Sequence, residues 1–222
     1  MSFELPPATR ALLIANVAVF VLQLLTGDAH TYALTEHFAL WPLGPDQFLG
    51  MDAAGDPVTG GFRIWQLVTY AFMHGGWTHL FFNMFALYMF GGPIERLFGR
   101  REFLVYYFVC LLFAGACQLL VLHFFPSGFF PTLGASGAIF GLLLAFGMMY
   151  PHERIMLLIP PIPMPAWVFV TGYGVLELVL GVTRTQAGVA HFAHLGGMLG
   201  GVLLIFYWRG KLPIKPRRRL MR

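Results

Sequence analysis

The sequence predicts an all-α polytopic membrane protein with six transmembrane helices, folded as a single domain over residues 1–222. Composition is the first reason, because 58% of the residues are hydrophobic and 11% are charged, whereas about a quarter of an ordinary soluble domain is charged. Too few polar side chains remain to cover a water-soluble globule. The second reason is a set of six separate apolar windows, and the third is the distribution of lysine and arginine between them.

Most of the apolar windows are long enough to cross the hydrocarbon core of a bilayer, which is roughly 30 Å thick and needs about 20 helical residues. The first is expected to be a retained helix, because no small-residue cleavage pattern follows it and five more spans come after it. The fourth is short, which suggests that it starts or ends below the membrane surface. The windows are approximately residues 10–26, 78–98, 102–125, 136–150, 165–182 and 190–208.

The basic residues predict that both termini are cytoplasmic. In that orientation 12 of the 14 basic residues lie on the inner side, many of them in a tail at about 209–222. The first outer loop, at about 27–62, carries five acidic residues instead, and its apolar side chains suggest a segment lying in the membrane interface. A cationic tail beside an anionic leaflet accounts for the pI near 9.3 without a nucleic-acid partner. We expect a multi-pass protein of a prokaryotic plasma (inner) membrane.

Polar side chains inside the predicted spans point to a function, because each is costly in hydrocarbon unless it has a partner or a task. With the N-terminus inside, spans two, four and six all run from outside to inside. His79, Ser136 and the pair His191 and His194 each lie within the first one or two turns of one of these spans. These groups are therefore expected at a similar depth, a little below the outer surface.

Small residues offer a way to bring two of these groups together. Ser136 directly precedes a G-x-x-x-G pattern in the fourth span, and His194 comes three residues before another in the sixth. Such ridges let helix backbones approach closely, so a contact between them would carry the imidazole toward the hydroxyl. The four glycines are Gly137 and Gly141, and Gly197 and Gly201.

A serine with a histidine as its base is the minimal apparatus of nucleophilic acyl transfer. The reaction also needs hydrogen-bond donors for the oxyanion, and Ser136 opens a helix whose first N–H groups have no intrahelical partner. His79 and Asn83 are four residues apart and share a helix face. They are therefore candidates for additional side-chain donors.

Each of these residues also has an ordinary structural interpretation. Ser136 fits a helix N-cap, the glycines fit helix packing, and His79 with Asn83 fits an interhelical hydrogen-bond pair. Glu177, near the middle of the fifth span, is expected to be neutral and hydrogen-bonded to a neighbouring helix.

Two histidine pairs raise the question of a metal or haem site. They stand at positions 74 and 79 and at positions 191 and 194. A pair three residues apart places two ligands on one face, but no carboxylate lies nearby in the sequence. We therefore expect no metal and no cofactor.

The chain resembles the rhomboid intramembrane serine proteases across essentially all six spans. The matching stretches contain H-x-x-x-N at His79 and Asn83, G-x-S-G at residues 134–137, and A-H-x-x-G-x-x-x-G at residues 193–201. The resemblance implies a Ser136–His194 dyad without a third carboxylate. It also implies that Asn83, His79 and the Ser136 N–H stabilise the oxyanion, and that the substrates are transmembrane helices cut near the outer face.

Two positions depart from the commoner family pattern. Many relatives have Trp-Arg in the first outer loop, where this chain has Trp65-Gln66, so a structural arginine pairing is lost or is replaced by Arg63. Many relatives also have tyrosine four residues after the nucleophile, where its ring stacks on the catalytic imidazole. Phe140 keeps that stacking surface without the hydroxyl.

Two other functions are weighed against proteolysis. A rhomboid-like protein that binds membrane clients without cutting them would share the fold, but it would have no reason to keep both Ser136 and His194. A proton-coupled carrier built around Glu177 would be expected to contain paired repeats and helices broken at mid-membrane. Neither is found in the sequence, so an intramembrane serine protease is the favoured prediction.

Overall fold

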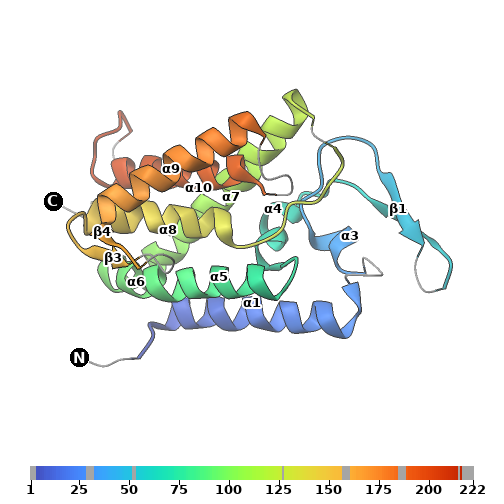
Figure 1. The fold of residues 1–222 in the computed structure, drawn as a ribbon, viewed down its shortest axis with the longest axis horizontal. Coiled ribbons are helices and arrows are strands. Elements are labelled where there is room, and N and C mark those ends of the chain that lie inside the picture. Colours follow the sequence, from blue (N-terminus) through green and yellow to red (C-terminus); the bar gives the residue numbers. More distant parts are fainter. Residues whose placement is uncertain are drawn as a thin grey trace.

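The computed structural model describes residues 4–28, 33–51, 54–126, 128–156, 161–184, 189–214 and 216. Helices dominate it and run side by side as a bundle (Figure 1). Four of the described helices are long and apolar enough to cross a membrane. They are α1 (Pro7–Leu25), α7 (Arg100–Phe124), α9 (Ala166–Thr183) and α10 (His191–Trp208).

Two further predicted spans appear in a different form. The second consists of three successive helical pieces, α5 (Trp77–Ala86), the π-helical turn η2 (Leu87–Gly91) and α6 (Gly92–Phe98). Pro93 accounts for the irregularity, because proline has no N–H to donate to the preceding turn. The fourth is α8 (Ser136–Met149), whose 14 residues reach about 21 Å at 1.5 Å per residue, well short of the hydrocarbon thickness. The number of spans and their orientation remain predictions.

The expectation of a purely α-helical chain was wrong in detail, because two small antiparallel hairpins are present. The predicted outer loop 27–62 contains a short helix, α3 (Thr35–Phe38), and the pair β1 (Gln47–Met51) and β2 (Pro57–Gly60), which projects from one end of the bundle in Figure 1. The second hairpin pairs β3 (Arg154–Met156) with β4 (Pro163–Pro165) at the start of α9.

Gln66, at the position where many relatives have arginine, organises the base of the outer loop. It begins the short helix α4 (Gln66–Thr69), which is followed by η1 (Tyr70–Phe72), and its side chain is fully buried. Its amide oxygen accepts from the backbone N–H of Trp41 and of Arg63, and its amide nitrogen donates to backbone carbonyls. Arg63 pairs with Asp46 at the surface, and this hydrogen-bonded guanidinium lowers the pKa of the Asp46 carboxyl. Glutamine therefore occupies a buried position at the base of the loop, and the arginine pairing present there joins Arg63 to Asp46 at the surface.

The centre of the bundle is α7, which packs against both α8 and α10. Tyr106 and Tyr107 are fully buried in it, and the Tyr106 hydroxyl donates to the carbonyl of Gly141 in α8 at 2.8 Å. Cys110 and Cys117 are free thiols in α7. Helix α7 therefore packs against both α8, which carries Ser136, and α10, which carries His194.

The glycine patterns mark the closest helix contacts. A Cβ atom at Gly197 would overlap the backbone carbonyl of Gly137, and one at Gly141 would meet Gly197 O at 3.1 Å, so α8 and α10 touch through their backbones here. Gly137 and Gly141 also face α7, since Cβ atoms there would overlap Ala114 and Cys110. Gly201 was expected to face α8, but a Cβ at this position would meet Tyr106 of α7.

One buried carboxylate fastens α1 to the bundle. Glu95 in α6 is 3% exposed. Its oxygens accept hydrogen bonds from the Ala8 and Thr9 backbone N–H groups and from the Thr9 hydroxyl, at 2.6–2.9 Å. These donors are at the N-terminus of α1, where a negative charge is favoured, so Glu95 has a purely structural set of partners.

Candidate active site

Ser136 and His194 lie in direct contact. Ser136 is the first residue of α8, His194 is in the first turn of α10, and the distance between His194 Nε2 and Ser136 Oγ is 2.8 Å. This is hydrogen-bond distance for a hydroxyl donating to an imidazole nitrogen. The backbone contact between Gly137 and Gly197 holds the two helix ends together immediately below this pair. The arrangement has the geometry of a nucleophile with its general base.

Aromatic rings cover the imidazole on one side. The ring of Phe140 is nearly parallel to that of His194, with centroids 4.2 Å apart and an interplanar angle of 5°. Tyr173 of α9 stacks on Phe140 at 5.1 Å. Phe140 therefore has the stacking position that the resemblance implies, and the ring from α9 extends the stack.

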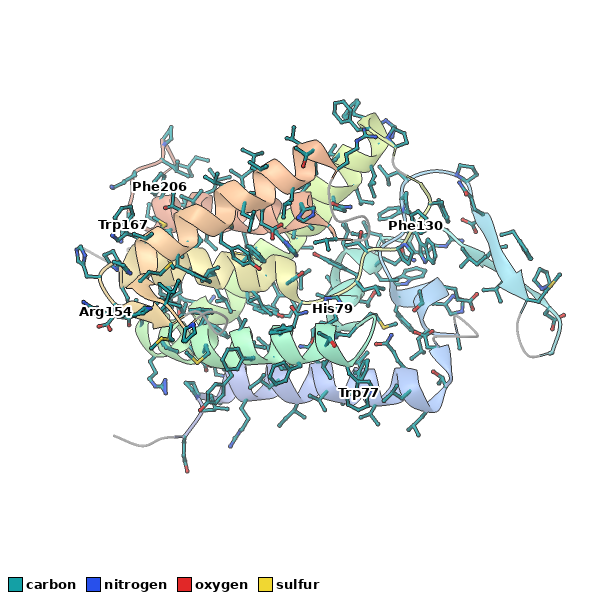
Figure 2. All side chains as sticks on the ribbon, in the orientation of Figure 1. Trp77, His79, Phe130, Arg154, Trp167 and Phe206 are labelled. Carbon is teal, nitrogen blue, oxygen red and sulfur yellow. The ribbon has the colours of Figure 1, made fainter. Side chains whose placement is uncertain are left out.

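His79 and Asn83 lie beside the segment that leads into α8, and Figure 2 labels His79 there on α5. Asn83 is buried, and its amide nitrogen donates to the carbonyl of His79 at 2.9 Å. A Cβ atom at Gly134 would be 2.6 Å from His79 Nε2 and 3.8 Å from Asn83 Nδ2. Gly134 also has a φ of +109°, which side-chain-bearing residues rarely adopt. The glycine of G-x-S-G therefore leaves room for His79 two residues before Ser136.

His74 lies beside His79, with the two ring centroids 5.1 Å apart. It lies in the loop before α5, its Nδ1 is 3.3 Å from the carbonyl of Phe72, and its ring meets that of His79 edge-on. Burial, assisted by repulsion from His79, lowers the pKa of His74 to about 4. His74 is therefore neutral at pH 7, and no positive charge from it faces His79.

Glu177 joins the site from α9, in a way that the sequence did not indicate. Its Oε2 atom is 2.9 Å from His194 Nδ1 and 2.7 Å from His191 Nδ1, and the carboxylate is 4% exposed. The predicted hydrogen bond from Glu177 to a neighbouring helix is present, and its partner is the imidazole that contacts Ser136. The neutral form predicted for Glu177 fits less well, because one carboxyl oxygen meets two imidazole nitrogens. The available signal was a lone acidic residue in an apolar span.

The same three side chains bear on the prediction that no metal binds. The argument against a metal was the lack of a nearby carboxylate, yet ligand atoms of Glu177, His191 and His194 lie within 4.8 Å of one another. Separations of 2.7 and 2.9 Å from one shared oxygen are hydrogen-bond lengths. The absence of a metal remains a prediction.

Comparison with known proteins agrees with the motifs. The Rhomboid domain family matches residues 61–211 of this chain. The chain belongs to the rhomboid family. It is 32% identical over 170 residues to "Rhomboid protein 1, mitochondrial" of Saccharomyces cerevisiae, which is 70% of this chain and 45% of that protein. It is 27% identical over 202 residues to "Rhomboid protease GlpG" of Yersinia pestis (strain Pestoides F), which is 90% of this chain and 62% of that protein.

The resemblance inferred from the three motifs is therefore confirmed at the level of the family. The protein is an integral membrane protein of mainly helical structure. It spans less than two thirds of the length of each of these two relatives. One relative is mitochondrial by name and the other is bacterial, so the family is found in more than one kind of membrane.

Proposed function

We propose that this chain is an intramembrane serine endopeptidase that cuts transmembrane protein substrates near the outer membrane face. The observation that carries the proposal is the 2.8 Å contact between His194 Nε2 and Ser136 Oγ. Ser136 is half-buried at the head of a helix, whereas His194 is buried between helices. A protein that only binds clients would gain nothing from this pairing, which makes the non-catalytic alternative the weaker candidate.

In the first half of the reaction, Ser136 Oγ attacks the scissile carbonyl carbon and its proton passes to His194 Nε2. The carbonyl oxygen becomes an oxyanion, for which the donors are the Ser136 backbone N–H and the side chains of Asn83 and His79. When the C–N bond breaks, His194 gives the proton to the leaving nitrogen. Phe140 limits movement of the imidazole through its parallel contact.

In the second half, a water molecule gives a proton to His194 while its oxygen attacks the acyl carbon. The acyl–oxygen bond to Ser136 then breaks, and the proton returns to the serine. Water must therefore reach Ser136, which is possible at membrane depth where polar groups line an aqueous cavity. The loop expected to cover such a cavity, about 183–189, lies mostly outside the described residues.

The proposed topology has six spans with both termini in the cytoplasm of a prokaryotic inner membrane. Support comes from the basic residues and from the arrangement in which α1 begins and α10 ends at the same end of the bundle (Figure 1). Ser136 and His194 then lie toward the outer end of their helices. The partners are transmembrane-helix substrates and the bilayer, with no nucleic acid, metal or cofactor required.

The test uses the purified chain in lipid vesicles with a labelled transmembrane substrate and a fluorophosphonate probe. Wild-type protein should cleave the substrate and form a covalent adduct at Ser136. Ser136→Ala should abolish both while leaving the thermal unfolding midpoint unchanged, because it removes a single oxygen atom. Cleavage by Ser136→Ala at the wild-type rate would contradict the proposal.

A further inference from the structure

The buried carboxylate of Glu177 is not used by a two-residue serine–histidine mechanism. Its Oε2 atom meets Nδ1 of both His194 and His191, at 2.9 and 2.7 Å. An ionised carboxylate oxygen can accept a hydrogen bond from both imidazoles, whereas a protonated oxygen would have to donate to one of them, and we take the carboxylate to be ionised. Both imidazoles then carry their hydrogen on Nδ1.

An ionised Glu177 selects one tautomer of His194. With its hydrogen on Nδ1, the ring presents the lone pair of Nε2 toward the hydroxyl of Ser136, which is the form a general base requires. The opposite tautomer would point an N–H at the serine oxygen and would be unable to take its proton. The carboxylate also lies where positive charge develops when His194 becomes protonated.

We propose that Glu177 is a positioning residue of the active site, so that the reaction runs on a Ser136–His194–Glu177 triad in which the glutamate comes from α9. This inference rests on the proposed protease function. Glu177 remains ionised throughout, and the transferred proton stays on His194. His191 donates to the same oxygen and holds the carboxylate in place, while its buried Nε2 has no hydrogen-bond partner among the described residues.

A purely structural role for Glu177 is the competing explanation, since the residue is one of three buried residues of α9 and ties that helix to α10. Glu95 is the matched control. It is equally buried and also accepts several hydrogen bonds, but its partners are at the N-terminus of α1. Removing either negative charge should lower stability, whereas removing that of Glu177 should also lower the reactivity of Ser136.

The experiment measures kcat, KM, thermal midpoint and the rate of fluorophosphonate labelling for Glu177→Gln, Glu177→Asp and Glu95→Gln. Glu177→Gln should lower kcat and labelling about 10²–10⁴-fold, the upper limit being the loss seen when the triad carboxylate of a soluble serine protease becomes an amide. KM should change little, and Glu177→Asp should recover part of the loss. Glu95→Gln should lower the midpoint and leave kcat and labelling of the folded protein within about twofold.

A double variant tests whether Glu177 acts through His194. In a His194→Ala background, Glu177→Gln should cause no further loss of labelling, because the group that it positions is absent. A further loss as large as in the wild-type background would overturn the triad. So would wild-type kcat in Glu177→Gln, or an activity that a metal chelator abolishes in wild type.

The outcomes separate this inference from the proposed function. If Ser136→Ala and His194→Ala lose activity but Glu177→Gln does not, the protease proposal is supported and the positioning role of Glu177 is refuted. If wild-type protein neither cleaves nor labels, while its thermal transition shows it to be folded, the proposed function fails first and the triad fails with it.

Discussion

The last two helices, α9 and α10, have the same length of 18 residues and follow each other in the chain. They differ in how much of their surface is buried in the bundle. Half of the apolar window of α10 is buried, against 22% of that of α9. In α10, glycines bring the backbone against α8 and α7. In α9, the buried residues are Ala166, Val170 and Glu177, and most other large side chains face outward.

This difference in burial divides the candidate active site into a packed side and a peripheral side. Its packed side, formed by α8 and α10, carries Ser136 and His194 on helices whose backbones touch and which bury nine residues each. Its peripheral side is α9, which contributes a carboxylate through hydrogen bonds and a ring through stacking. Under the proposed function, a substrate helix that enters from the membrane would displace fewer buried side chains at α9 than at α10.

Gly197→Val should have the largest effect on the packed side. The added side chain has no flexible neighbour to displace, because the nearest atoms are the backbone of Gly137. Helices α8 and α10 must then separate, which carries His194 away from Ser136. We expect cleavage and fluorophosphonate labelling to fall below detection and the thermal midpoint to drop. Activity at the wild-type level would place the decisive helix contact elsewhere.

Asn83→Ala should have a smaller effect, confined to the chemical step. Loss of one oxyanion donor in a soluble serine protease costs roughly 10²–10³-fold in kcat, and a similar fall with little change in KM is expected here. Fitting initial rates over a range of substrate concentrations separates the two constants. An unchanged kcat with a raised KM would instead make Asn83 a substrate-contacting residue.

Much of the packed side was predictable, because sequence patterns report which residues share a helix face. The glycine patterns predicted an α8–α10 contact, and the positions of Ser136 and His194 relative to them predicted the meeting of hydroxyl and imidazole. Gly201 was misplaced because a helix in a bundle has more than one neighbour. Four residues turn a helix by about 400°, so Gly201 is rotated by some 40° from Gly197, toward α7.

The peripheral side was less predictable for a physical reason. Glu177 is 17 residues from His194 and on another helix, and an apolar helix with little burial gives no periodic signal of which face is turned inward. The outer hairpin of β1 and β2 was also missed, because its composition resembles that of an interfacial loop. In both cases the structure depends on contacts between segments, which a reading of one segment at a time does not contain.

Gly172→Val should have the smallest effect and supplies the matched control for Gly197→Val. Gly172 lies in the middle of α9 one residue before Tyr173, and a Cβ atom there would meet nothing within 4 Å. The same substitution therefore adds apolar volume to an open surface. We expect kcat and the labelling rate to stay within about twofold of wild type, and the thermal midpoint to stay within a few degrees. A loss of activity with a normal midpoint and a raised KM would mean that substrate docks on this face of α9, whereas a loss of stability would mean that α9 is packed as firmly as α10 and would remove the distinction between the two helices.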